Sequence, residues 1–481
     1  MMRETLRDVL VNLEQHGKLI RVFKSVDISW EVACLVKWMF QAVEEPNRRG
    51  LWFENIAGHN IPVVIGALGV SAEVYAHILG VIPEEINATW EKALLNPVAP
   101  LKVTDGPCQE TVLLKDQVRL DRLPIPTWTP EKDIGPYITT PVVTSNAHTR
   151  RQNVGFYRTR VRDANSVVSN LNPGRQGFLN ACTWTEQGMS APIAWVIGAH
   201  PVVQYAATAN LPWGMDEIEA AGGVLGKPVE LVKAASIDLL VPADAEIVIE
   251  GKIYPGETDV EGPFGEFAGY MGAVAQKPVA HITAITHRKN PIYCAMTSQM
   301  PPSESTIVQS LTNAGVVQKM LRHDLGEYTV QDVYIDQTFG GLMAHAIIAM
   351  TPRYPGHAKK VGRMVADCTP IKRITVVNPD VDIRDSSHVE WAMNSRFDPA
   401  RDTEIIRDVF SPMGMDPSIR VEDGTSHPGS KVVIDATQTI DAGLFSLPAK
   451  DKMTAALNSW REAGLPEFSI PKRAHLRIER S

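Results

Sequence analysis

The sequence predicts a mixed α/β and β protein of several domains: an N-terminal α/β region, a central β-rich region and a C-terminal α/β region. At 481 residues the chain is too long for a single ordinary hydrophobic core. Helical spacing opens the chain, short β-type runs separated by turn residues dominate from about 120 to 300, and buried-strand and helix patterns mix after 305. We expect domains at 1–115, 116–305 and 306–481.

The N-terminal region is predicted to begin with an amphipathic helix followed by a strand. Four apolar residues recur at i, i+3, i+4 and i+7, namely Leu6, Val9, Leu10 and Leu13. The helix should end near Gly17, and residues 19–22 have the pattern of a strand. The proline-rich stretch 96–100 is typical of a linker.

The central region has short β-type runs bounded by turn residues, at 142–144, 194–197, 245–250 and 279–286. This pattern predicts an antiparallel sheet or a barrel with a few helical insertions. One such insertion is predicted at 216–225, with Asp216 as N-cap and Gly222-Gly223 as its end.

The C-terminal region returns to an α/β pattern. Ile307, Val308 and Leu311 lie on one helical stripe, and residues 343–350 and 374–377 have the apolar character of buried strands. A late helix is predicted at 450–464.

Composition excludes several classes of protein. Lys and Arg total 47 against 55 Asp and Glu, a net charge of −8, which argues against a nucleic-acid-binding protein. The five cysteines are scattered and lack CxxC spacing, as expected for a reducing compartment without zinc-thiolate sites. No apolar run approaches ~18 residues, so we expect a cytoplasmic protein with no signal peptide and no membrane span.

The loop Glu261-Gly-Pro-Phe-Gly-Glu266 places two carboxylates on an irregular backbone. Two carboxylates in different surroundings can divide the roles of general acid and charge partner. A surface turn with two solvated glutamates is the alternative interpretation. The apolar residues Phe264 and Phe267 favour a partly buried loop.

Two further segments carry residues suited to metal and carboxylate chemistry. Asn153 can ligate a hard cation through its side-chain oxygen, and Arg158 can clamp a carboxylate through two parallel hydrogen bonds. An ordinary strand with a salt-bridged arginine explains the same residues. Glu217 lies in the first turn of the predicted helix, where the helix dipole alone could account for a carboxylate.

Together and in this order, the three segments resemble the UbiD family of reversible decarboxylases, which use prenylated FMN. The resemblance runs over nearly the whole chain and includes 96–100, 197–201, 222–250, 381–383, 391–393, 398–402 and 431–437. It implies that the central β-rich region is a split β-barrel of the FMN-binding type and that the C-terminal domain mediates oligomerisation.

The resemblance also implies residue roles. Arg158 and Glu261 match the family's catalytic arginine–glutamate pair, and Glu266 matches its proton donor. Metal ligands fall on Asn153, Glu217 and, at the position where the family commonly has histidine, Gln176. The full set implied to bind the cofactor is Asn153, Phe156, Tyr157, Arg158, Arg175, Gln176, Glu217 and Lys431.

The implied cofactors are prenylated FMN and a divalent metal, Mn²⁺ or Mg²⁺, with K⁺ as a further candidate. Gln176 can offer an amide oxygen to such a cation, but it lacks the imidazole that favours transition metals. The implied partners are a small carboxylic acid as substrate, a flavin prenyltransferase that supplies the cofactor, and further copies of the chain in a homodimer or homohexamer.

The expected reaction is decarboxylation of an aromatic, heteroaromatic or α,β-unsaturated acid, and the sequence does not select among these substrates. An oxidoreductase that uses ordinary FMN on the split-barrel fold is one alternative. A non-catalytic subunit with a degraded metal site is another, although Arg158, Glu261 and Glu266 argue against it.

Overall fold

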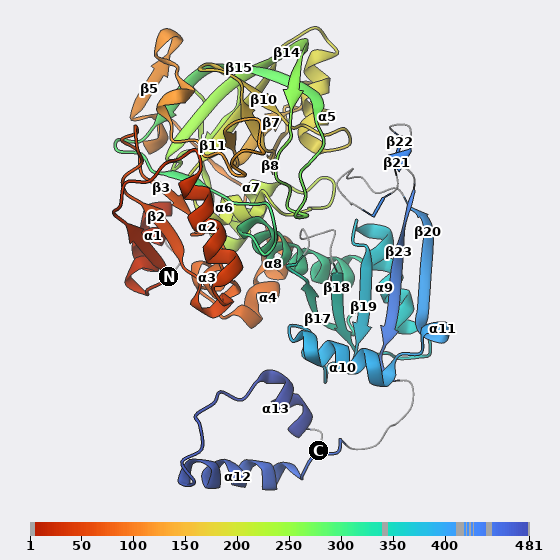
Figure 1. Ribbon diagram of the computed structural model, residues 1–481. Helices are drawn as coiled ribbons and strands as arrows, with labels where there is room; N and C mark the ends of the chain where they lie inside the picture. Colours follow the sequence, from red (N-terminus) through yellow and green to blue (C-terminus); the bar gives the residue numbers. More distant parts are fainter. Residues whose placement is uncertain are drawn as a thin grey trace. The chain divides into compact units, whose positions relative to one another are not determined.

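A computed structural model describes residues 5–338, 345–409, 418–419, 421–422, 425–426, 428–438 and 445–479. The chain forms two compact units, the first mainly residues 1–316 and the second mainly residues 317–481, and we describe each by itself (Figure 1). No helix among the described residues is long and apolar enough to cross a membrane.

The first unit begins with the predicted helix, α1 (Leu6–Gln15). Thr5 and Asp8 cap it reciprocally: the Thr5 hydroxyl accepts from the Asp8 N–H at 3.3 Å, and the Asp8 carboxylate accepts from the Thr5 N–H at 3.0 Å. The expected strand at 19–22 is confirmed as β1. It belongs to a four-stranded sheet of β1 (Leu19–Val22), β2 (Gly50–Phe53), β3 (Val63–Ile65) and β16 (Tyr293–Ala295).

Four further helices alternate with or follow these strands along the chain. They are α2 (Glu31–Ala42), α3 (Ala72–Leu79), α4 (Ile86–Leu95) and α8 (Glu304–Lys319). Val32, Val36 and Phe40 of α2 are buried in the hydrophobic core. Lys37 and Gln41 lie four residues apart on another face of α2. Their side chains contact the segment that follows β16, where both donate to the Met300 carbonyl.

The central sheet has nine strands, in the order β6-β9-β10-β15-β14-β11-β7-β8, with β5 paired to β15. All of its pairs are antiparallel, so the predicted antiparallel sheet or barrel is confirmed as a curled half-barrel. Its strands are β5 (Thr111–Leu114), β6 (Tyr137–Ile138), β7 (Pro141–Ser145), β8 (Gln152–Phe156), β9 (Thr159–Val161), β10 (Ser166–Ser169), β11 (Ala191–Ile197), β14 (Ile247–Glu261) and β15 (Ala275–His287).

A small sheet joins β4 (Leu101–Val103), β12 (Glu230–Lys233) and β13 (Leu240–Pro242), and three helices, α5 (Gln176–Thr185), α6 (Pro201–Ala206) and α7 (Glu217–Leu225), complete the unit. The proline-rich stretch before β4 packs on the unit, since the Val98 N–H donates to the Glu219 carbonyl at 3.0 Å.

Helix α7 confirms one prediction and corrects another. The Asp216 side chain accepts from the N–H groups of Ile218 and Glu219, as predicted for an N-cap. The helix reaches Leu225, the last residue of the predicted segment, but it passes through Gly222-Gly223, the predicted stop. Gly226 ends it with a φ of 67°. A Cβ on Gly223 would lie 2.5 Å from the Ala93 carbonyl oxygen of α4, so the glycines allow two helices to approach closely.

The second unit holds a five-stranded sheet in the order β17-β18-β19-β23-β20, in which β18, β19 and β23 are parallel and the edge strands antiparallel. The buried strands predicted at 343–350 and 374–377 are β18 and β19, although residues 343–344 lie outside the described part. The strands are β17 (Val330–Ile335), β18 (His345–Met350), β19 (Arg373–Val377), β20 (Thr403–Val409), β23 (Gly429–Ala436) and the separate pair β21 (Val421–Glu422) and β22 (Thr425–Ser426). The helices are α9 (His357–Cys368), α10 (Ser386–Arg396), α11 (Pro399–Asp402), α12 (Lys450–Glu462) and α13 (Lys472–Ile478).

Candidate active site

The acidic loop leaves the end of β14 and is held by neighbouring segments of the first unit. Glu261 is the last residue of β14, and Gly262, with a φ of 85°, turns the chain. The Gly262 N–H donates to the Tyr137 hydroxyl at 3.2 Å, and the Gly265 N–H donates to Asp133 Oδ1 at 3.1 Å. The Glu261 side chain is fully buried and that of Glu266 is 7% exposed, so the solvated surface turn is excluded.

One guanidinium contacts both carboxylates of this loop. Arg158 follows β8, and its Nε and Nη2 donate to the two carboxylate oxygens of Glu261, each at 2.8 Å. Its remaining nitrogen, Nη1, pairs with Glu266 Oε1. The guanidinium also lies over the ring of Phe264, 5.0 Å from its centroid. The structure therefore brings together the three residues predicted to be catalytic.

Three polar residues near this cluster were not found by sequence reasoning. Tyr137 and Asp133 accept the loop N–H groups, and burial raises the pKa of both side chains. Lys277 of β15 is paired in register with Asp259, two residues before Glu261, and donates to Asn172 Oδ1 at 2.7 Å. Burial lowers the Lys277 pKa, while the charge of Glu261 opposes that shift. Only the pairing of β14 with β15 reveals the nearness of Lys277.

Asn153 and Glu217 form the second cluster, which is the candidate metal centre. Glu217 Oε1 accepts from Asn153 Nδ2 at 2.9 Å, and Oε2 accepts from the Val154 N–H at 3.1 Å. Burial raises the pKa of Glu217 to about 7, and the Val154 bond opposes this shift. The carboxylate therefore lies where its negative charge is poorly solvated, an environment that favours a cation beside it.

Tyr157 joins this cluster to the start of α5. Its hydroxyl donates to Asn153 Oδ1 at 3.3 Å and accepts from the Gly177 N–H at 2.9 Å. A Cβ on Gly177 would lie 2.7 Å from the Tyr157 ring, so glycine is required for the ring to lie this close. Phe156, the last residue of β8, is half-buried and packs against the core.

Gln176 and Arg175 lie at the same helix start. Gln176 Nε2 donates to Asn180 Oδ1 at 3.1 Å, and Arg175 occupies the N-cap position of α5 without a side-chain cap bond. No group of three or more His, Cys, Asp or Glu with metal-binding geometry occurs among the residues that the structure describes. A carboxylate together with amide oxygens would suit a hard divalent cation such as Mg²⁺ or Mn²⁺.

Lys431 lies on β23 in the second unit. Its ammonium group donates to the Ala366 carbonyl and, at 2.5 Å, to the Thr369 carbonyl near the end of α9. Its contacts are therefore within that unit, and burial lowers its pKa.

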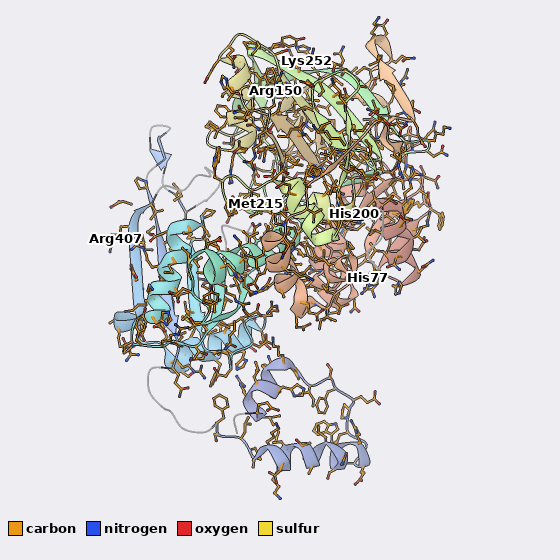
Figure 2. The ribbon with its side chains drawn as sticks, turned by 180° about the vertical axis from the view of Figure 1, so that it is seen from behind. His77, Arg150, His200, Met215, Lys252 and Arg407 are labelled. Atoms are coloured by element: carbon orange, nitrogen blue, oxygen red, sulfur yellow. The ribbon has the colours of Figure 1, made fainter. Side chains whose placement is uncertain are left out.

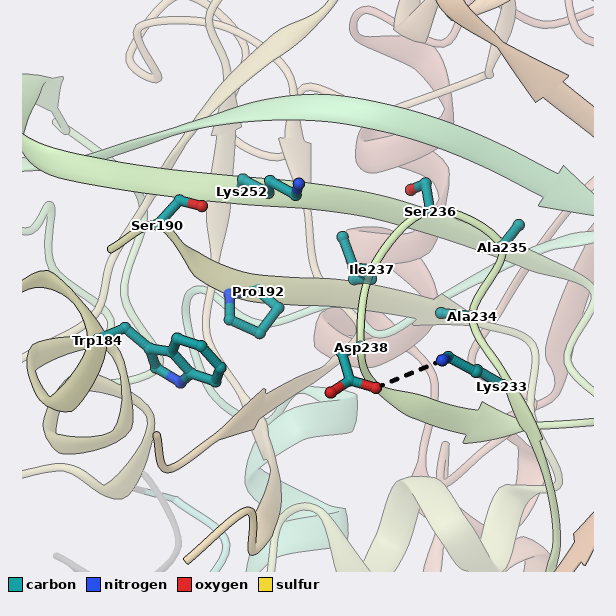
Figure 3. A pocket seen from close by; sticks show the side chains of 10 residues that line it. All are labelled: Trp184, Ser190, Pro192, Lys233, Ala234, Ala235, Ser236, Ile237, Asp238 and Lys252. Atoms are coloured by element: carbon teal, nitrogen blue, oxygen red, sulfur yellow. Dashed lines mark ion pairs between the residues drawn. The ribbon is translucent and has the colours of Figure 1, made fainter. Parts of the chain in front are cut away.

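A hollow of about 430 Å³ lies elsewhere in the first unit, between the C-terminal end of α5 and the loop 234–238 (Figure 3). Lys252 and Arg150, both labelled in Figure 2, belong to this region: Lys252 lines the hollow, and Arg150 lies 4.7 Å from the ring centroid of Trp184, which also lines it. Much of its polar lining is paired internally, as with Lys233 and Asp238 at 3.6 Å. None of its lining residues belongs to the two clusters described above.

Three family models match the chain in order. They are the 3-octaprenyl-4-hydroxybenzoate carboxy-lyase N-terminal domain at residues 10–94, the Rift-related domain at 101–301 and the C-terminal domain at 306–436.

Solved structures are similar over almost the full length. An evolved dimeric form of the UbiD-class enzyme HmfF from Pelotomaculum thermopropionicum, in complex with prenylated FMN, is 32% identical, with 95% of this chain and 100% of that chain covered and a TM-score of 0.82. Vanillic acid decarboxylase from Sedimentibacter hydroxybenzoicus is 29% identical, with 96% and 100% covered and a TM-score of 0.84. A 3,4-dihydroxybenzoic acid decarboxylase from Enterobacter cloacae is 25% identical, with 95% and 100% covered and a TM-score of 0.81.

The fold described above and these full-length similarities agree with one another. The chain belongs to the UbiD family of prenylated-FMN-dependent carboxy-lyases.

Proposed function

We propose that this enzyme catalyses the reversible, non-oxidative decarboxylation of an aromatic, heteroaromatic or α,β-unsaturated carboxylic acid at the Arg158 cluster. The observation that carries the proposal is the contact of one guanidinium with two buried carboxylates, one of which is held by two hydrogen bonds of 2.8 Å. In such an arrangement Glu261 remains an ionised partner of the arginine, while Glu266 can take up and release a proton.

Loss of CO₂ from an unsaturated carbon leaves an electron pair that no protein side chain can stabilise. When bound, prenylated FMN supplies the electron sink for this step. The chain's own residues are then required for positioning and for proton transfer.

Glu266 is assigned as the proton donor to the carbon that loses CO₂. Arg158 offsets the charge of one carboxylate, so a proton on the second carboxyl leaves the three-residue cluster neutral. Glu261, bound through both of its oxygens, fixes the guanidinium plane. In the carboxylation direction Glu266 would remove the same proton.

Asn153, Glu217 and Gln176 are assigned to a divalent cation, Mn²⁺ or Mg²⁺, that would neutralise charge between the protein and the flavin phosphate. K⁺ is a further candidate cation. The side chains of the first unit proposed to contact the cofactor or its metal are Asn153, Phe156, Tyr157, Arg158, Arg175, Gln176 and Glu217. The poorly solvated Glu217 carboxylate supports this assignment.

The proposed assembly is a homodimer or homohexamer, and a flavin prenyltransferase is proposed to supply the cofactor. One of the similar structures is described as an evolved dimeric form in complex with prenylated FMN, which supports a dimer and the proposed cofactor.

The test is purification after coexpression with a flavin prenyltransferase, followed by mass spectrometry of the released cofactor. The purified protein is then incubated in D₂O with a panel of aryl, heteroaryl and α,β-unsaturated acids, and CO₂ release and H/D exchange are measured. Prenylated FMN together with exchange on at least one acid supports the proposal. Ordinary FMN without exchange would favour the oxidoreductase alternative, and a flavin-free protein would favour the non-catalytic one.

A further inference from the structure

Gln299 lies in an unusual backbone conformation next to the acidic loop. It belongs to the short segment between β16 and α8 and has a φ of 68°. Non-glycine residues rarely adopt this left-handed conformation, because their Cβ then crowds the backbone. Gln299 is nevertheless only 5% exposed. The surrounding structure must therefore hold this residue in place.

Two side chains of α2 hold the segment. The Lys37 ammonium donates to the Ser298 carbonyl and, at 3.3 Å, to the Met300 carbonyl. Gln41 Nε2 donates to the Met300 carbonyl at 3.0 Å and to the Pro302 carbonyl at 3.3 Å. The carbonyls on both sides of Gln299 are thus bound from one face of α2, which fixes the backbone at this residue.

The Gln299 amide is only half satisfied. Its Oε1 accepts from the Thr297 hydroxyl at 3.2 Å, whereas its buried Nε2 has no hydrogen-bond partner among the described residues. Exchanging the two amide positions would leave the oxygen without a partner instead. A buried amide group without a partner is costly, which points to a ligand that completes it.

The Gln299 side chain lies against the acidic loop at Gly265. A Cβ on Gly265 would lie 2.7 Å from Gln299 Cγ, so only a glycine at this position lets the two segments meet so closely. Gly265 immediately precedes Glu266 in the chain. The unsatisfied amide therefore adjoins the loop at which the proposed reaction occurs.

We propose that Gln299 contacts the substrate and determines its specificity, with Nε2 donating a hydrogen bond to an oxygen substituent on the ring or on the unsaturated chain of the acid. This inference rests on the proposed decarboxylase function. It selects, within that substrate class, acids that carry a hydroxyl or a second carboxylate over acids that carry no further oxygen. Lys37 and Gln41 are positioning residues for this contact.

The experiment compares the cofactor-loaded wild type with Gln299→Leu, Gln299→Glu and Gln299→Gly. Leucine removes the amide, glutamate replaces its donor with a second oxygen, and glycine removes the amide while accommodating the positive φ, which keeps the backbone intact. Gln187→Leu, at an exposed position beyond α5, is the matched control. The probes form two pairs, in each of which the first acid carries additional oxygen groups. They are 3,4-dihydroxybenzoate and benzoate, and furan-2,5-dicarboxylate and furan-2-carboxylate.

Dissociation constants are measured from perturbation of the flavin absorbance, and KM and kcat for any probe that turns over. We expect the three Gln299 variants to bind the oxygen-substituted acid of each pair about 2- to 13-fold more weakly, as the loss of one hydrogen bond implies. The dissociation constant of the unsubstituted acid should not change. Lys37→Met should shift the same preference in the same direction, and Gln187→Leu should not.

The assignment of Gln299 would be overturned if the variants bound both acids of a pair equally more weakly. It would also be overturned if no variant changed either dissociation constant. A loaded, active wild type that binds neither oxygen-substituted probe would overturn it as well. These outcomes leave cofactor loading and turnover on other acids intact. Absence of prenylated FMN and of exchange with every acid would instead reject the proposed decarboxylase function.

Discussion

Arg158 and Glu261 form a two-pronged ion pair in which both N–O distances are 2.8 Å and the carboxylate is completely buried. The pair joins the end of β8 to the end of β14, strands that are not neighbours in the central sheet. It therefore fixes the acidic loop at the position from which Glu266 also reaches the guanidinium.

Replacing Arg158 should damage stability and catalysis to different extents. Arg158→Ala leaves two buried carboxylates without their arginine and is expected to lower the free energy of unfolding by about 3–5 kcal/mol. Arg158→Lys retains a charge but not the planar fork, so it should be more stable than alanine yet lose roughly a hundredfold in kcat. Urea denaturation and turnover of the cofactor-loaded variants measure both. An Arg158→Lys variant with the wild-type kcat would contradict the positioning role of Arg158.

Glu266→Gln should abolish proton transfer while leaving the cofactor bound. The loss of a well-placed general acid is expected to lower kcat by about 10²–10⁴-fold. The matched control is Glu257→Gln, on β14 before the acidic loop, at a half-exposed position paired with His281. Turnover and flavin content are measured together. Normal turnover in Glu266→Gln would remove this residue from the donor role.

Asn153→Ala should lose the cofactor, because it removes an oxygen ligand of the proposed metal. The expected result is a colourless purified protein, read from the flavin absorbance and from metal analysis. A fully loaded Asn153→Ala protein would contradict the metal assignment.

Gln176→His should increase the affinity for Mn²⁺, since imidazole is a better ligand than an amide oxygen for transition metals. Titration of the metal-free protein with Mn²⁺, followed by electron paramagnetic resonance, measures the dissociation constant. An unchanged constant would show that position 176 does not contact the metal.

The second unit should lose stability in mild acid because of His345. Burial and the neighbouring Arg373 lower its pKa from 6.5 to about 4, and Arg373 Nη2 lies 2.7 Å from its Nδ1. The unfolded chain therefore binds a proton below pH 6.5 that the folded unit resists. Stability is fully present above pH 6.5 and is lost as the pH falls towards 4.

His345→Gln should weaken this loss of stability between pH 7 and 4.5, as measured by urea denaturation at several pH values. His475, exposed on α13, provides the control substitution His475→Gln. An identical pH dependence in wild type and His345→Gln would contradict the assignment.

Gly223→Ala should destabilise the first unit even though alanine favours helices. Its Cβ would meet the Ala93 carbonyl at 2.5 Å, so α7 and α4 would have to move apart, at a cost of about 1–3 kcal/mol. Gly135→Ala, where no atom lies within 4 Å of the added Cβ, is the control. Thermal unfolding of both variants decides whether the close approach matters.

Local patterns in the sequence determined much of the fold. The apolar spacing of Leu6 to Leu13 predicted α1, and Asp216 predicted the start of α7, because periodicity and capping depend on residues close together in the chain. The acidic loop could be singled out in the same way, and its match to a family gave roles to Arg158, Glu261 and Glu266. The end of α7 was wrong because glycines that permit helix packing have the same local signature as glycines that end a helix.

Tertiary structure alone decided which distant residues meet. Arg158 and Glu261 are 103 positions apart, and their two-pronged contact depends on how β8 and β14 are placed in one curled sheet. Lys277 and Gln299 carried no sequence signal, because strand register and the contact of α2 with the segment after β16 bring them to the loop. Charge pairing and burial act through space, so the sequence determined the chemical groups of the site and the fold determined their partners.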